Sequence, residues 1–188
     1  MMNFPQFRFK RDASVRVLWP ALLVLCGLTL AAPQPASNAA DTQREAMRKL
    51  NFLVGRWRGP VTVVRGPGEP LHLIQAEDVE SKLDGLVLLI EGKSTGADGN
   101  IPFQALATIA FDEGTHTYRF RAYNEGHYID TELTVIPDGF SWGFAAGPAH
   151  IVNTMHLTDK GQWQESTEVA VGDNPPRKSI DMLLDHQP

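Results

Sequence analysis

Phe103-Gln-Ala-Leu-Ala-Thr-Ile-Ala-Phe111 is the stretch that decides the fold of this 188-residue chain. Its odd-numbered positions are all apolar, whereas Gln104 and Thr108 fall between them. A period of two places these apolar side chains on one face of an extended strand. The stretch therefore predicts a β-strand that buries one face in a hydrophobic core.

The same alternation recurs in later segments of the chain. Apolar side chains share one face within 140–144, 151–157 and 180–184, namely Phe140, Trp142, Phe144, Ile151, Met155, Leu157, Ile180, Met182 and Leu184. Polar residues such as Thr154 and Asp181 fall on the opposite face. One-sided burial in strand after strand predicts a sheet that encloses a core.

Turn signals rich in Gly, Asp, Asn and Pro arrive at regular intervals after residue 55. They lie at 66–70, 84–85, 96–100, 112–115, 124–126, 137–139, 146–148, 159–161 and 172–176. Nine turns separate ten strands, and such short connections join antiparallel neighbours. Ten strands in simple sequence are expected to close on themselves, because closure removes exposed edges. The prediction is an all-β domain over 41–188, a ten-stranded antiparallel meander β-barrel.

One short helix is expected before the first strand. Met47, Leu50 and Leu53 sit at helical spacing, and Gly55 ends the segment.

The segment Leu50-Asn-Phe-Leu-Val-Gly-Arg-Trp57 joins this helix to the first strand. A short helix leading into Gly-x-Trp resembles the lipocalin and fatty-acid-binding superfamily, the calycins. It is similar in particular to uncharacterised bacterial lipocalin-like domains related to nitrobindin, with further partial matches at 140–144, 163–165 and 180–184. The resemblance implies that Gly55 and Trp57 form a structural plug at one barrel end. It also implies an interior that binds small hydrophobic or amphipathic molecules.

Nitrobindin relatives carry a haem-ligating histidine on a strand close to the C-terminus. Here the only late histidine is His186, which follows the last expected strand. No cofactor is therefore predicted, and haem stays open only as a disfavoured alternative. No two of the six histidines show the spacing of metal ligands, and no metal site is predicted. Cys26 is the only cysteine and lies near the N-terminus, so the barrel has no disulfide and no thiol.

Arg119, Arg121 and Tyr123 share one strand face and are candidate ligand-binding residues. If that face points inward, two guanidinium groups and a phenol could hold a carboxylate or phosphate. In the alternative, both arginines lie on the solvent face, paired with Asp130 or Glu132, while Phe120 fills the core. The sequence leaves both arrangements open.

Two further candidates complete the predicted ligand site. Glu165 and Glu168 fall on opposite strand faces, so at most one points inward, and a buried carboxylate needs a partner. Glu168 is taken as a ligand-binding candidate, and Trp142 as part of an aromatic wall. The chain has no Gly-x-Ser-x-Gly motif, and no catalytic residue is assigned.

Residues 1–39 have the pattern of a signal peptide and its cleavage zone. Four basic residues lie between Arg8 and Arg16, and Val17–Ala32 carries no charge. This run is shorter than the roughly 20 residues of a membrane span. Cleavage is expected after Ala39 or, alternatively, after Ala31. A retained N-terminal anchor and lipidation at Cys26 are the other interpretations.

Charge and composition limit the function. After residue 40 the chain holds 13 Lys and Arg against 21 Asp and Glu, without a basic run. Such a surface does not suit nucleic acid, and no membrane partner is expected after cleavage. The sequence predicts a periplasmic or secreted barrel that binds a small hydrophobic or amphipathic molecule. The alternatives are an enzyme using an Arg/Tyr/Glu cavity for isomerisation or decarboxylation, and an accessory protein with a filled barrel.

Overall fold

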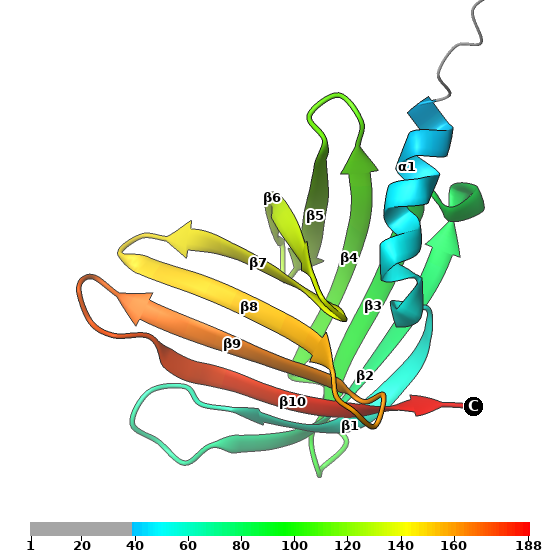
Figure 1. Ribbon diagram of the computed structural model, residues 1–188. Helices are drawn as coiled ribbons and strands as arrows, with labels where there is room; N and C mark the ends of the chain where they lie inside the picture. Colours follow the sequence, from blue (N-terminus) through cyan, green and yellow to red (C-terminus); the bar gives the residue numbers. More distant parts are fainter. Residues whose placement is uncertain (1–38) are drawn as a thin grey trace, which may run out of the picture. The chain divides into compact units, whose positions relative to one another are not determined.

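The computed structural model describes residues 39–188, which form a closed β-barrel with a short helical segment before it (Figure 1). The predicted signal peptide lies outside the described residues, apart from Ala39 at the end of its cleavage zone. Within the described part of the chain, no helix is long and apolar enough to cross a membrane.

The elements follow the chain in a simple order. The helical elements are α1 (Ala39–Met47), the 3₁₀ turn η1 (Arg48–Leu53) and a second 3₁₀ turn η2 (Leu83–Gly85). The strands are β1 (Gly55–Val63), β2 (Leu71–Lys82), β3 (Val87–Thr95), β4 (Phe103–Asp112), β5 (Thr117–Asn124), β6 (His127–Ile136), β7 (Gly139–Ala146), β8 (Ala149–Leu157), β9 (Trp163–Val171) and β10 (Arg177–Gln187).

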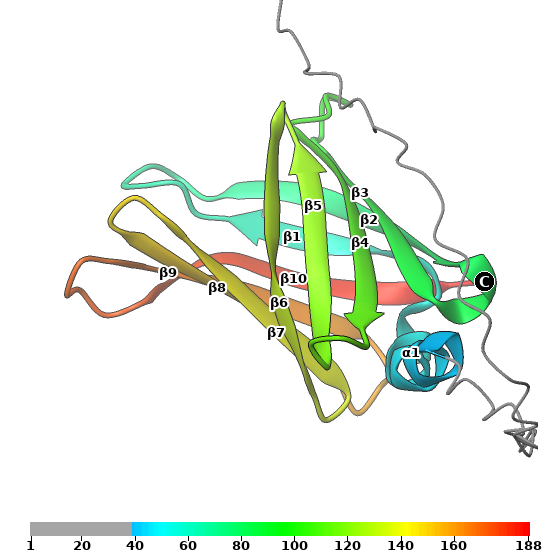
Figure 2. The ribbon, with the colours of Figure 1, turned by 90° about the horizontal axis from the view of Figure 1, so that it is seen from above.

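Each strand pairs in antiparallel fashion with the next one along the chain, and β1 pairs with β10 to close the sheet. In Figure 1, β7–β10 run across the view whereas β3–β5 run up it, and Figure 2 shows the barrel from above. The predicted ten-stranded antiparallel barrel and its short N-terminal helix are confirmed. The last predicted strand proves longer than expected, because β10 includes His186.

The period-two pattern sets which side chains fill the barrel. Ile109 of β4, Met155 of β8 and Leu184 of β10 are fully buried, while their sequence neighbours face outward or lie nearer the surface. Burying each of these side chains is worth about 1.5–3 kcal/mol relative to exposure. Alternation therefore fixes the register of the whole sheet.

The helical segment packs on one end of the barrel. Met47, Leu50 and Leu53 are buried there, and the chain takes the 3₁₀ form from Arg48 to Leu53. A 3₁₀ helix has three residues per turn, so side chains three apart align on one face. Trp57 of β1 donates its indole N–H to the Leu53 carbonyl at 2.8 Å, which ties this segment to the first strand.

Gly59 of β1 lies against the backbone of β10. A Cβ atom at this position would lie 2.1 Å from the backbone carbonyl oxygen of Leu183. Backbone cannot move aside as a flexible side chain can, so only glycine fits. The contact between β1 and β10 that closes the barrel is therefore favoured by the absence of a side chain at position 59.

Replacing Gly59 with alanine is expected to lower the free energy of unfolding by about 1–3 kcal/mol, the usual range for an overpacked site. Urea denaturation followed by tryptophan fluorescence measures this change. Gly68→Ala is the matched control, since a Cβ at Gly68 meets nothing within 4 Å. Equal stability of the two variants would contradict the account of this contact.

Candidate ligand-binding cavity

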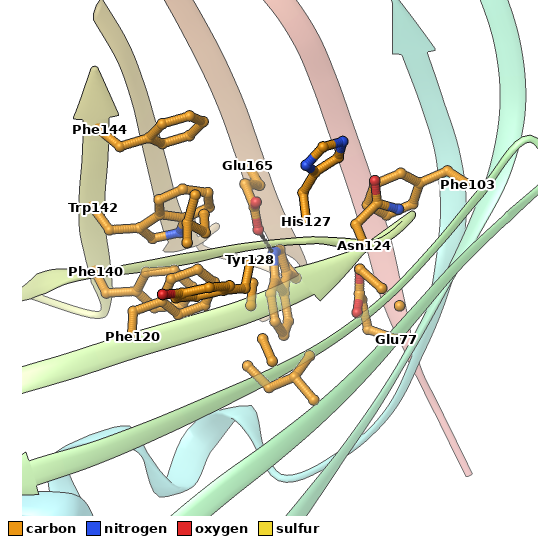
Figure 3. Close-up of a pocket in the computed structure, with 17 residues that line it drawn as sticks. Glu77, Phe103, Phe120, Asn124, His127, Tyr128, Phe140, Trp142, Phe144 and Glu165 are labelled. Atoms are coloured by element: carbon orange, nitrogen blue, oxygen red, sulfur yellow. Dashed lines mark hydrogen bonds between the residues drawn. The ribbon is translucent and has the colours of Figure 1, made fainter. Parts of the chain in front are cut away.

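The barrel contains a cavity of about 390 Å³ (Figure 3). Its walls come from β2 to β7 and from β9. Asn124 at the end of β5 and His127 at the start of β6 lie at its open side, away from α1. The helical segment therefore covers one end of the barrel, and the cavity opens toward the other.

Aromatic side chains make up one wall of the cavity. Trp142 stacks on Phe120 with ring centroids 4.4 Å apart and on Phe144 at 6.1 Å. Phe140 meets Trp163 edge-on at 6.2 Å. The opposite side is lined by small residues, including Gly92, Ala105 and Ala107. Large rings facing small side chains leave the space open.

Glu165 enters the cavity from β9 and is held at both oxygens. The indole N–H of Trp163 donates to its Oε2 at 2.7 Å, and the Asn153 side-chain amide donates to its Oε1 at 2.5 Å. The Thr167 hydroxyl in turn donates to Oδ1 of Asn153 at 2.7 Å. Two donors aimed at one carboxyl group fix its position and favour its charged form.

Glu77 enters from β2 and is positioned by a short relay. The Gln75 side-chain amide donates from Nε2 to Glu77 Oε1 at 2.6 Å, and the Ser94 hydroxyl donates to the side-chain oxygen Oε1 of Gln75. Gly92 makes room for the carboxyl group, because a Cβ there would lie 2.7 Å from Glu77 Oε2. Among the described residues, nothing donates a hydrogen bond to Oε2, which leaves that oxygen available to the cavity.

Burial raises the proton affinity of both carboxyl groups, and Glu165 raises that of Glu77 further. Both lie deep in the barrel, and what exposure they keep is toward the cavity rather than the outer surface. Burial and the nearby Glu165 carboxylate raise the pKa of Glu77 to about 8, against the lowering effect of Gln75. Burial also raises the pKa of Glu165, although its two donors oppose this. At neutral pH the pair therefore carries less than two negative charges, with the proton on Glu77.

Arg119, Arg121 and Tyr123 lie on the outer face of β5. Tyr123 is 46% exposed, and Arg121 donates from Nε to Asp130 at 3.0 Å. Arg119 contacts the same carboxylate at 2.5 Å, and the hydrogen bonds from Arg121 and then Arg119 lower the pKa of Asp130. The inward arrangement considered from the sequence is therefore not the one the structure adopts.

The physical reason lies in the residues between the arginines. Phe120 and Ala122 line the cavity, and alternation sends their neighbours to solvent. Glu168 is likewise exposed on β9, so Glu165 is the inward member of that pair. Of the five ligand-binding candidates, only Trp142 lines the cavity. The arginine, tyrosine and Glu168 side chains considered for an enzyme site therefore do not come together in the cavity.

The Gly-x-Trp segment lies at the helix-covered end. Trp57 is 3% exposed and meets Trp163 edge-on at 5.7 Å. His186 packs edge-on against Trp57 at 4.7 Å, directly over Gly55, where a Cβ would lie 2.3 Å from its Nε2. His186 is thus part of the barrel end rather than of the cavity lining.

Sequence reasoning missed Glu77 and Gly92, although one signal was present. Leu73, Gln75, Glu77 and Val79 alternate in β2, so two polar residues fall on an otherwise apolar face. Polar residues on the inward face of a strand mark a buried polar site. Within residues 39–188, no group of three or more His, Cys, Asp or Glu side chains could hold a metal ion.

No protein-family model matches the chain, and no curated protein matches it in sequence. Among solved structures, it is similar to the crystal structure of Rv2717c from M. tuberculosis, with a TM-score of 0.59 and 12% sequence identity. The match covers 76% of this chain and 98% of the other. The likeness shows a shared barrel fold.

The carboxyl pair makes stability depend on pH. Glu77 keeps its proton in the folded protein up to about pH 8 but loses it near 4.5 when unfolded. Its contribution to stability is therefore complete below pH 4.5 and is lost as the pH rises to about 8. Between these pH values the free energy of unfolding should fall by about 1.4 kcal/mol per pH unit for each proton that only the folded protein retains.

Glu77→Gln removes this proton uptake, so urea unfolding measured from pH 5 to 8.5 should show a flatter fall in stability than the unaltered protein. Glu168→Gln, which changes an exposed glutamate, should keep the original slope. A slope unchanged by Glu77→Gln would exclude Glu77 as its source.

Proposed function

We propose that this protein is an exported, calycin-like binding protein that holds a small, mainly apolar molecule inside its barrel. The observation that carries the proposal is the cavity of about 390 Å³ with its aromatic wall and open mouth. Ligand pockets usually measure about 300–1,000 Å³ and combine apolar walls with a few placed polar groups. This cavity has both properties.

The composition of the lining supports binding over a purely structural barrel. Trp142, Phe144 and Phe103 line the cavity and are only partly buried. On the side that faces the cavity these rings lack van der Waals contacts, and a bound ligand would supply them. A filled barrel, considered from the sequence, would not leave this space.

The calycin assignment rests on the Gly55-Arg-Trp57 motif together with the closed barrel. Trp57 is buried at one barrel end, beneath the helical segment, which supports the plug that the resemblance implies. Export rests on the basic leader and the uncharged run 17–32. Both parts of the proposal therefore have their own support, and each is tested separately.

Ligand binding is tested with the neutral fluorescent dye N-phenyl-1-naphthylamine. The dye should bind saturably to the barrel, with a fluorescence increase as it leaves water. Ala122→Phe fills part of the cavity and should weaken binding by about tenfold or more, since each 1.4 kcal/mol of lost contact is a factor of ten.

The matched control is Ala145→Phe, which adds the same ring at an exposed position on β7. It should bind the dye as the unaltered protein does. Absence of saturable binding, or equal binding by both variants, would refute the proposal that the cavity is the binding site. Circular dichroism confirms that the variants are folded.

Export is tested by expressing the full chain in a Gram-negative bacterium and fractionating the cells. The protein should appear in the periplasm with its N-terminus at Ala40, or at Ala32 if the alternative site is used, as read by mass spectrometry. Removing residues 17–32 should keep it in the cytoplasm. An uncleaved protein in the membrane fraction would instead indicate a retained anchor.

A further inference from the structure

We propose that the cavity selects an organic cation, an apolar or aromatic molecule that carries a protonated amine or quaternary ammonium group. Its charge would lie between Glu77 and Glu165, and its apolar body against the aromatic wall. This inference rests on the proposed function, because it names the class of ligand for the same site.

Charge balance inside the cavity is the first argument. Among the described residues, the lining holds two carboxyl groups but no lysine or arginine. The Arg58 and Lys93 side chains belong to outward-facing positions of β1 and β3, on the far side of the sheet from the carboxyl groups. A buried carboxyl group without a positive partner keeps its proton until a cation takes the proton's place, and the described lining supplies no such partner. A cationic ligand would provide it.

The free oxygen of Glu77 is the second argument. Oε1 is already occupied by the Gln75 amide, whereas Oε2 faces the cavity without a donor from the described residues. The Ser94–Gln75 relay fixes the carboxyl group before any ligand arrives. A preorganised acceptor on one side and Glu165 on another make a site where positive charge is favoured.

The aromatic wall is the third argument. Trp142 and Phe120 present stacked rings to the cavity, and Trp163 presents its ring beside Glu165. Aromatic faces attract cations, and tryptophan does so most strongly. Rings and carboxylates together are the surroundings in which ammonium groups are bound.

The mouth of the cavity carries the same sign of charge. Glu125 lies in the turn between Asn124 and His127 at the opening, and among the described residues this turn and its two flanking residues include no lysine or arginine. An acidic rim raises the local concentration of cations and repels anions. A fatty acid or other carboxylate would meet unfavourable charge at both the rim and the interior.

Binding of a cation should be linked to loss of a proton. The titratable side chains facing Glu77 across the cavity are Glu165 from β9 and His127 at the mouth. Its neighbours on the adjoining strands, Trp57 on β1 and Gly92 on β3, do not titrate. A cation next to Glu77 therefore replaces the proton held there, so affinity should rise with pH.

Three ligands of matched shape test this inference. They are phenethyltrimethylammonium, its neutral carbon isostere (3,3-dimethylbutyl)benzene, and the anion 4-phenylbutyrate. Binding is measured by competition with N-phenyl-1-naphthylamine at pH 6.5 and pH 8.5. The ammonium group has a permanent charge, so any pH dependence comes from the protein.

The cation is expected to bind at least tenfold more tightly than the neutral isostere at pH 8.5, and its affinity should rise on the order of tenfold from pH 6.5. The neutral isostere should show no comparable rise, and 4-phenylbutyrate should bind most weakly. Glu77→Gln should abolish the pH dependence and lower cation affinity, and Glu165→Gln should also lower it. Glu168→Gln should leave it unchanged.

The outcomes separate the two proposals. If the neutral isostere or the anion binds as tightly as the cation, the selectivity for cations is overturned while the binding function stands. The same holds if Glu77→Gln and Glu165→Gln leave cation affinity intact in folded protein. If the dye and all three ligands fail to bind, the binding function itself is refuted.

Discussion

The pairing of β1 with β10 is the interaction on which the remaining structure depends. It turns a meander of neighbouring hairpins into a closed sheet, so every strand has two partners and no edge remains. This closure is favoured by Gly59, since the Leu183 carbonyl occupies the space that a side chain would need. It also brings Trp57, Trp163 and His186 together at one end. The enclosed cavity exists only because this last pair of strands meets.

Sequence alone was sufficient for the fold because strand alternation and turn chemistry are local properties. The alternation from Phe103 to Phe111 predicts the inward face of this strand without information from any other strand. The turn residues predict where each strand ends. The helical segment was also predictable from the sequence, since the apolar residues Met47, Leu50 and Leu53 are spaced three residues apart. Its 3₁₀ form was missed because helical spacing alone does not separate it from an α-helix.

The site was much less predictable, because it is made by register between distant segments. One face of β5 carries Arg119 and Arg121, and the other carries Phe120 and Ala122. The second face is the more apolar, so it turns toward the interior and the arginines turn toward solvent. The space for the Glu77 carboxyl group depends on Gly92, which becomes its neighbour only when β2 and β3 pair. Likewise, Glu165 of β9 accepts a hydrogen bond from Asn153 of β8, a contact that forms only when these two strands pair. None of these contacts follows from spacing along the chain.

Gly92 has a consequence for how this barrel can vary among related proteins. Its missing side chain and the Glu77 carboxyl group occupy one shared volume, so neither position is independent of the other. A barrel with alanine or serine at position 92 must have a smaller residue at position 77 or a displaced carboxyl group. The two positions are therefore expected to covary, and the pair serves as a signature for recognising other barrels with the same acidic interior.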